Sequence, residues 1–177
     1  MSNIREMLPK EYGLLDTFLH EAIYTAPEEP RPPRSETSKP NLRIYVEEFG
    51  REGDTAICAE TDGQIVGAAW SRLMHGYGFI DDAVPEIAVS VLPEHRGQGI
   101  GTALLMELVR RCARRGFPAL SLSVQRANPA IRLYKRLGFH EVTGDEDEAV
   151  MVLPLNTTSA GAAIDSTFSD AHSANEA

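Results

Sequence analysis

A glycine-rich turn is the part of the sequence most suited to chemistry. The letters RGQGIGT at 96–102 follow an apolar segment closed by Pro93 and open a long amphipathic segment. Such a turn aims several backbone N–H groups at one point, where the positive end of the helix dipole also lies. Glycine lets the backbone approach a ligand closely and adopt positive φ. The turn therefore predicts a site for a phosphate or pyrophosphate, with a ligand-free turn as the alternative.

Two common phosphate-binding patterns do not fit this turn. A P-loop needs a lysine after its last glycine, and Thr102 follows Gly101 here. A dinucleotide fingerprint reads G-x-G-x-x-G at the first strand–helix turn, whereas this run reads G-x-G-x-G and comes after several predicted strands. The spacing therefore fits neither a P-loop nor a dinucleotide-binding loop.

A second motif follows, NPAIRLYKRLGF at 128–139. The stretch RGQGIG at 96–101 resembles the Q/R-x-x-G-x-G/A signature of the GCN5-related N-acetyltransferases (GNAT family). The second motif is similar to that family's N-x(n)-A-x-x-L-Y-x-x-x-G-F block. The resemblance covers roughly residues 56–155. One departure is the spacing from Asn128 to Tyr134, six residues rather than the more common seven, which places Ala127 at the usual asparagine position.

The resemblance implies that acetyl-CoA binds as the acyl donor, without a metal. In the family the pantetheine arm pairs with the strand before the loop like an added strand, and the pyrophosphate lies on the loop amides. Arg96 either reaches a phosphate or braces the turn, and Asn128 caps its helix and contacts coenzyme A. The implied cosubstrate-binding residues are Val89, Ser90, Val91, Arg96, Gly97, Gln98, Gly99, Ile100, Gly101, Thr102, Asn128 and Tyr134.

The resemblance also implies direct acetyl transfer to a primary amine of a small molecule or peptide, without an acyl-enzyme. Tyr134 aligns with the tyrosine near the thioester sulfur, so we expect it to be the general acid; the alternative is an aromatic packed under its helix. Glu86 starts the strand before the loop and is the expected base, acting through water; the alternative is a solvated strand end. A second reading of the whole chain is a non-catalytic acyl-CoA-binding sensor or regulatory module.

The acceptor site is predicted only from position along the chain. We expect Tyr24, Tyr77, Phe79, Asp81 and Asp82 to gather at the pocket mouth. The segment 25–40 holds five prolines and is either a plain surface loop or a mobile lid.

Composition narrows the class of protein. The net charge of −9 argues against a nucleic-acid binder, and no apolar run approaches the ~20 residues that span a bilayer. The first residues lack a secretory pattern, and Cys58 and Cys112 are predicted to be reduced core thiols. We therefore expect a cytoplasmic protein without membrane or nucleic-acid partners, and a homodimer remains open because similar enzymes are often dimers.

The chain length suits one domain, which we expect over 1–155, and the composition of 156–177, with almost no large apolar residue, predicts a disordered tail. The resemblance implies the class α/β (α+β), a GNAT-like fold whose central mixed, mostly antiparallel twisted sheet of six to seven strands is flanked by about four helices. The expected strands are 4–7, 55–60, 64–73, 85–92, 119–124, 139–142 and 149–155. The expected helices are 9–24, 42–49, 99–115 and 128–138.

Overall fold

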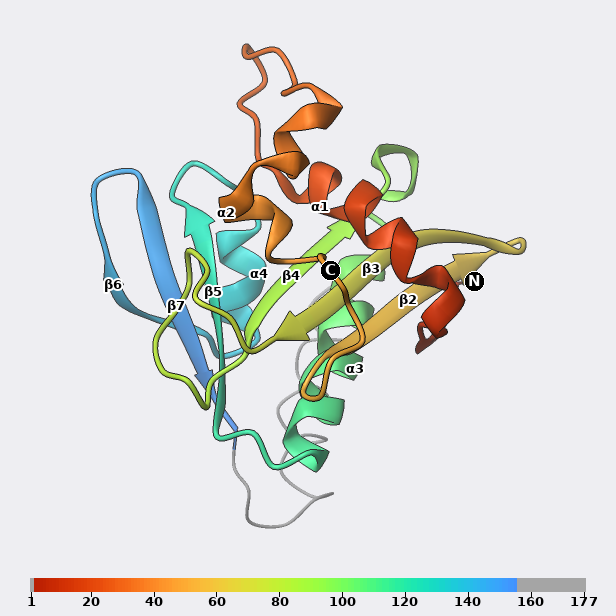
Figure 1. The fold of residues 1–177 in the computed structure, drawn as a ribbon. Coiled ribbons are helices and arrows are strands. Elements are labelled where there is room, and N and C mark those ends of the chain that lie inside the picture. Colours follow the sequence, from red (N-terminus) through yellow and green to blue (C-terminus); the bar gives the residue numbers. More distant parts are fainter. Residues whose placement is uncertain (1, 156–177) are drawn as a thin grey trace, which may run out of the picture.

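The computed structural model describes residues 2–155, and the tail predicted for 156–177 lies outside them. Its centre is a seven-stranded sheet with the order β1-β2-β3-β4-β5-β7-β6, in which only β4 and β5 run parallel (Figure 1). The α/β fold class and the mixed, mostly antiparallel sheet are thus confirmed. The strands are β1 (Asn3–Glu6), β2 (Thr55–Thr61), β3 (Gln64–Arg72), β4 (Glu86–Val91), β5 (Ala119–Gln125), β6 (His140–Gly144) and β7 (Glu148–Pro154).

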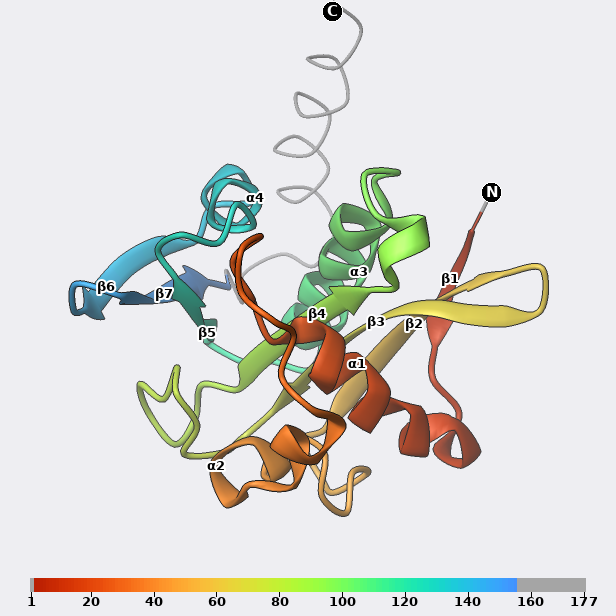
Figure 2. The ribbon, with the colours of Figure 1, turned by 90° about the horizontal axis from the view of Figure 1, so that it is seen from above.

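Four α-helices cover the two faces of the sheet. They are α1 (Leu15–Ala22), α2 (Pro40–Arg43), α3 (Ile100–Arg114) and α4 (Ile131–Arg136). Viewed from above, α1 and α2 lie on one side of the sheet and α3 and α4 on the other (Figure 2). Successive side chains of a strand point to opposite faces of the sheet and so pack in different apolar clusters. Ile57 packs in the cluster under α3, and its neighbour Cys58 packs in the cluster under α1.

Two turns have backbone conformations that follow directly from their residues. Asp62 and Gly63 both have positive φ in the hairpin between β2 and β3, as a type I′ turn requires. Gly116, with φ of +81°, ends α3: its amide donates to Ala113 O, and the amide of Phe117 donates to Cys112 O. These two bonds form a Schellman motif and satisfy carbonyls at the helix end.

Three predicted helices have different limits in the structure. Residues Pro9–Leu14 of the predicted 9–24 helix form a 3-10 helix before α1. In the second motif, α4 begins at Ile131 rather than at Asn128, after a turn through Pro129. The helix predicted for 42–49 is wrong: α2 ends at Arg43, and a series of turns follows in which Glu48 has a φ of +48°.

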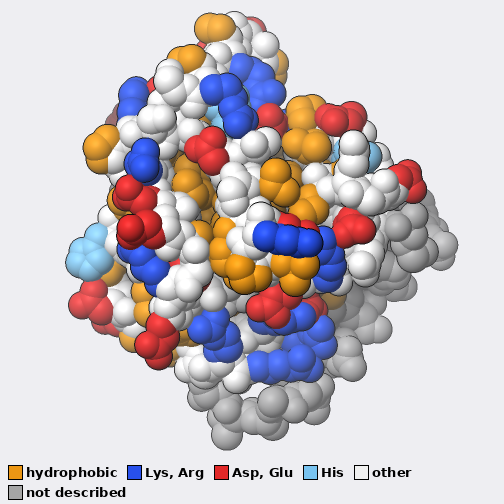
Figure 3. Space-filling view, turned by 45° about the vertical axis from the view of Figure 1, so that its right-hand side comes forward, with side chains coloured by type: hydrophobic (Ala, Val, Ile, Leu, Met, Phe, Trp, Pro, Cys, Tyr) orange, Lys and Arg blue, Asp and Glu red, His pale blue; other side chains and the backbone are white. Residues whose placement is uncertain are grey.

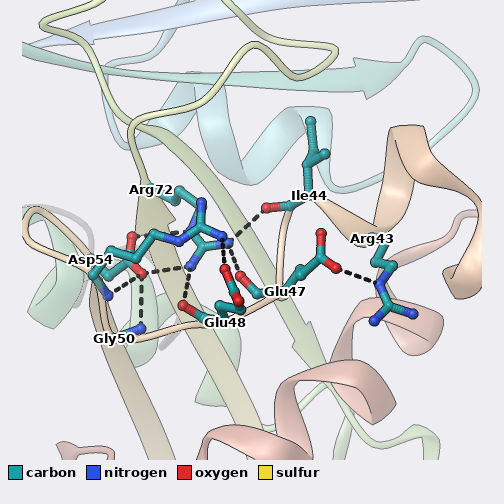
Figure 4. A network of polar contacts seen from close by, with 8 residues as sticks. Arg43, Ile44, Glu47, Glu48, Gly50, Asp54 and Arg72 are labelled. Atoms are coloured by element: carbon teal, nitrogen blue, oxygen red, sulfur yellow. Dashed lines mark hydrogen bonds and ion pairs between the residues drawn. The ribbon is translucent and has the colours of Figure 1, made fainter.

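A buried arginine explains why no helix forms there. The guanidinium of Arg72, at the end of β3, donates to the carbonyl oxygens of Ile44 and Glu47 at 2.8 and 2.7 Å and to that of Glu48 at 3.2 Å. It also forms a two-point ion pair with Asp54, in which both side chains are only 3% exposed (Figure 4). These carbonyls converge on the guanidinium instead of lying parallel along a helix axis, so the segment 44–48 wraps around the charge.

The surface carries both signs of charge. Acidic and basic side chains alternate among apolar ones on the face drawn in Figure 3. The ion pairs of the described residues include Arg111 with Glu107, within α3, and Arg43, the last residue of α2, with Glu47 in the turns that follow. Within residues 2–155, no helix combines the length and the apolar character needed to cross a bilayer.

We predict that Arg72→Met lowers the free energy of unfolding by about 3–5 kcal/mol, because Asp54 would remain buried without its counter-ion. Urea unfolding monitored by circular dichroism measures this. Arg43→Met is the matched control from the same network of segments: its ion pair with Glu47 is exposed, so its loss costs less than about 1 kcal/mol. Equal effects of the two substitutions would contradict the anchoring role of Arg72.

Candidate functional site

The site lies where β4 and β5 separate. The two strands share a single pair of partners, Glu86 with Ser121, although β4 pairs with β3 along its full length. A cavity of about 370 Å³ occupies this region. It is lined by Leu19, Ala22, Ile23, Tyr24, Glu36, Leu42, Tyr45, Tyr77, Glu86, Ile87, Ala88, Val89, Leu122, Ser123, Val124, Gln125, Asn128, Tyr134 and Glu148.

The separation leaves backbone groups of β4 without a strand partner. The carbonyl of Pro85 accepts from the amide of Ser121 at 3.0 Å. Backbone groups alternate in direction along a strand, so those of Val89 and Val91 also point toward β5. The side chain of Arg96 donates to the Val91 carbonyl at 2.8 Å, whereas Val89 lines the cavity. Val89 thus offers an amide and a carbonyl to an extended chain entering the gap.

The glycine-rich turn offers a second set of free donors. Gly97 and Gly99 have φ of +73° and +77°, and a Cβ at either would meet no atom within 4 Å. The first bond into α3 is from the amide of Ala103 to Gly99 O. The amides of 97–102 make no backbone hydrogen bond among the turns and caps of the described chain. Six amides just before and at the start of a fifteen-residue helix are therefore without a backbone partner, as at an anion site.

Arg96 braces the turn in this structure. Its Nε holds the Val91 carbonyl, and its terminal nitrogen pairs with Glu21 of α1 at 2.9 Å. Glu21 also pairs with Arg31 from the proline-rich segment. Arg96 thus connects the turn, the end of β4 and α1.

Glu86 is a buried carboxyl group at the inner end of the gap. It is 2% exposed, and its Oε2 has no hydrogen-bond partner among the described residues. Burial raises its pKa to about 7, although a hydrogen bond from the Tyr45 hydroxyl to Oε1 opposes the rise. A carboxyl group with a pKa near 7 can exchange a proton at neutral pH, as a general base must.

Tyr45 fixes the position of Glu86. Its hydroxyl donates to Glu86 and accepts from the backbone amide of Tyr77 at 3.1 Å. Tyr45 follows directly on Ile44, whose carbonyl is held by Arg72, and its own carbonyl accepts from the indole of Trp70 at 3.1 Å. The loop after β3 closes over the carboxyl group, since a Cβ on Gly76 would lie 2.4 Å from Glu86 Oε2.

Tyr134 reaches the cavity from α4, on the opposite side of the sheet from Tyr45. Its ring packs edge-on against Phe139 with centroids 6.0 Å apart. Burial raises the pKa of its hydroxyl to about 12, so the phenol keeps its proton at neutral pH. The ring packs against Phe139 beneath its helix, and the side chain also lines the cavity, as the expected acid role requires.

Asn128 lies in the turn before α4 and does not cap the helix, whose N-cap is Ala130. The expected capping role is therefore wrong, because the helix starts three residues later than the motif suggests. The side-chain oxygen of Asn128 instead accepts from the amide of Ala130 at 2.9 Å, within the turn. Asn128 also lines the cavity.

The structure divides the residues expected at the acceptor site. Tyr24 and Tyr77 line the cavity, and Tyr77 is held at the mouth by the side chain of Asn41. The other three lie together on the exposed loop between β3 and β4 and do not line it: Phe79 stacks on His75, Asp82 pairs with His75, and Asp81 accepts from the amide of Ala83.

Five polar residues that line the cavity were not predicted from the sequence as site residues: Glu36, Tyr45, Ser123, Gln125 and Glu148. A signal for part of this set is visible in β5, where Ser121, Ser123 and Gln125 alternate with apolar residues. That alternation marks one polar face on a strand whose other face is buried. Tyr45 has no such signal, because its place depends on the Arg72 network.

The arrangement combines four functions, three in the gap between β4 and β5 and one at the glycine-rich turn that follows β4. It offers free backbone groups to an extended chain, six amides to an anion, a proton acceptor near neutral pH and a tyrosine that keeps its proton. Within residues 2–155 no group of three or more His, Cys, Asp or Glu side chains could hold a metal ion. The chemistry that fits these parts is group transfer from a phosphate-bearing donor, with proton removal on one side and proton donation on the other.

Comparison with known proteins agrees with this description. The model of the acetyltransferase (GNAT) family matches residues 18–139. The [ribosomal protein bS18]-alanine N-acetyltransferase of Escherichia coli strain K12 is 38% identical over 79 residues, which is 38% of this chain and 53% of that protein. The match thus spans about half the length of that relative.

Two further proteins match over more of their length. An N-alpha-acetyltransferase of Sulfurisphaera tokodaii is 32% identical over 128 residues, covering 63% of this chain and 76% of the relative. A phosphinothricin acetyltransferase of Sinorhizobium meliloti, solved in complex with AcCoA, superposes with a TM-score of 0.63 and 26% identity. That match covers 91% of this chain and 92% of the solved chain.

We predict that Glu86→Gln stabilises the protein above neutral pH. The folded-state pKa of about 7 exceeds the ordinary 4.5, so ionising the buried carboxyl group in the wild type costs stability as pH rises. The variant should gain nothing below about pH 4.5, then gain progressively up to pH 7, reaching at most about 3 kcal/mol. Denaturant unfolding between pH 4 and 8.5 measures this. The exposed Glu52→Gln is the control, and a pH-independent difference for Glu86→Gln would contradict the prediction.

Proposed function

Because this chain belongs to the acetyltransferase (GNAT) family, we propose that it transfers the acetyl group of acetyl-CoA directly to a primary amine of a small molecule or peptide. The observation that carries the proposal is the gap between β4 and β5, where the buried Glu86 and the protonated Tyr134 line one cavity beside the free backbone of Val89. Residues 1–155 form the catalytic domain in this proposal. The names of the two relatives, both N-acetyltransferases, support an amine as the acceptor.

The free donors of the structure suit coenzyme A. The pyrophosphate is assigned to the amides of 97–102, and the pantetheine arm to the gap along residues 89–91, where Val89 offers the free backbone groups. Ser90 borders this stretch without offering it a free group, since its hydroxyl donates to Phe18 O at 2.6 Å and its backbone pairs with Ala68 of β3. Arg96 keeps the turn in shape rather than holding a phosphate, and Asn128 positions α4.

Glu86 and Tyr134 divide the proton transfers. Acetyl-CoA supplies the activated thioester. The amine nitrogen forms a bond to the acetyl carbon, and Glu86 takes a proton from the nitrogen through water. The amide of Val89 stabilises the negative charge that develops on the carbonyl oxygen. The carbon–sulfur bond breaks, the sulfur leaves with the proton of Tyr134, and solvent restores both side chains.

Calorimetric titration with acetyl-CoA, followed by thiol release against a panel of amines, tests the proposal. Binding with turnover on an amine is the expected result. Binding without turnover on any amine would favour the acyl-CoA sensor, and absence of binding would overturn the assignment of the gap and the turn.

Gly99→Asp should raise the Kd for acetyl-CoA at least ~10-fold, because a carboxylate would stand where the pyrophosphate is assigned. Gly63→Asp is the matched control. It has the same positive φ and the same open space around the α-carbon, but lies in the hairpin between β2 and β3. An unchanged Kd in a folded Gly99→Asp protein would contradict the loop assignment.

Tyr134→Phe should lower kcat at least ~10-fold while leaving the Kd for acetyl-CoA within a factor of about two, since only the proton donor is removed. Steady-state thiol release and calorimetry give the two numbers. Tyr24→Phe, another tyrosine of the cavity lining, is the control. Equal kcat values for wild type and Tyr134→Phe would remove the acid role.

A further inference from the structure

The cavity between β4 and β5 is acidic. Three carboxyl side chains line it, those of Glu36, Glu86 and Glu148, and no lysine, arginine or histidine is among its lining residues. The remaining polar side chains are tyrosines, a serine and amides, which carry no charge at neutral pH. An acceptor bound here therefore meets acidic side chains and no basic one among the lining residues.

The three carboxyl groups differ in their partners. Glu36, on the segment before α2, forms an ion pair with Lys39 at 2.7 Å. Neither Glu86 nor Glu148 has a cationic partner within 4.0 Å in the described part of the chain. Glu86 is in addition 2% exposed with one unpaired oxygen. A buried carboxylate without a counter-ion is unfavourable, and a bound cation would relieve that cost.

Glu148 faces the same space from the far side of β5. It opens β7 opposite Gln125, and its Oε1 accepts a hydrogen bond from the Ser123 hydroxyl. Glu86 is opposite Ser121 on the other side of β5. Ser121, Ser123 and Gln125 lie on one face of that strand, so the two carboxyl groups stand on the same face. Their backbones are two strand spacings apart across the sheet and four residues apart along β5, roughly 16 Å in all. The bond from Ser123 draws the Glu148 carboxyl group back along β5, toward the level of Glu86.

We propose that the acceptor is a small primary amine carrying a second positive charge several methylene groups away, with the reacting nitrogen at Glu86 and the distal cation at Glu148. This inference rests on the proposed acetyl transfer and names the acceptor class for it. Tyr24 and Tyr77 line the space around such a chain. An acceptor with a carboxylate at the distal position finds no cation there and meets Glu148 instead.

A matched series of acceptors tests the charge requirement: 1,5-diaminopentane, 1-aminopentane and 5-aminopentanoate differ only in the distal group. With saturating acetyl-CoA, kcat/KM for the diamine should exceed that for the monoamine at least ~10-fold, and 5-aminopentanoate should be the poorest. Higher salt should reduce the advantage of the diamine because the pairing is electrostatic.

Glu148→Gln should lower the ratio of kcat/KM for the diamine to kcat/KM for the monoamine at least ~10-fold, mainly through the KM of the diamine. The amide oxygen can still accept from Ser123, so the fold is preserved. Glu146→Gln removes the same charge from the exposed turn before β7 and should change neither acceptor.

The outcomes separate this inference from the proposed function. Failure to bind acetyl-CoA, or to acetylate any amine, would overturn the proposed function itself. Turnover with equal kcat/KM for diamine and monoamine, or a diamine preference that survives Glu148→Gln, would overturn only the acceptor class. A peptide N-terminal amine that outperforms the diamine and is unaffected by Glu148→Gln would also overturn it.

Discussion

The parallel pairing of β4 with β5 stops after one pair of residues, Glu86 with Ser121, and the functional region depends on that constraint. If the two strands stayed paired, the amide and carbonyl of Val89 would be hydrogen-bonded to β5, and no cavity would separate Glu86 from Tyr134. On either side of the break the sheet is continuous, with β3 pairing β4 fully and β7 pairing β5 fully. The break is therefore local, and the apolar clusters on both faces keep the two halves of the sheet in place.

A chain of buried polar contacts connects Arg72, at the end of β3, to Glu86 in the candidate site. Arg72 gathers the carbonyls that follow α2 and pairs with Asp54, which holds the segment carrying Tyr45. Tyr45 in turn holds one oxygen of Glu86 and the amide of Tyr77. Such a network is strong only when all its members are satisfied, and here one member, Glu86 Oε2, is not. The unsatisfied group is the one to which we assign the proton transfer.

That arrangement sets stability against function. Burying Glu86 costs free energy at neutral pH, and the neighbouring charge of Glu148 contributes to the raised pKa. The same two features keep a proton acceptor poised near pH 7 and create a field that favours cations in the cavity. Active sites often combine these properties, because groups arranged for chemistry are seldom arranged for maximal stability.

The sequence by itself determined the features that depend on residues close to one another along the chain. Periodicity located the strands and α3, and Asp62-Gly63 and Gly116 placed a hairpin and a helix end, since each depends on backbone preferences within a few residues. The two motifs, with their resemblance, identified the glycine turn, Tyr134 and Glu86. Only the tertiary structure decided the features in which segments distant along the chain come into contact. The segment expected to be a helix at 42–49 instead wraps around the guanidinium of Arg72 from β3. On an exposed loop, Phe79 and Asp82 contact His75, and Asp81 accepts from the amide of Ala83. Glu148 lines the same cavity as Glu86, on the other side of β5. The physical reason is that hydrogen bonds and charges act over a few ångströms in space, whereas these partners lie tens of residues apart along the chain.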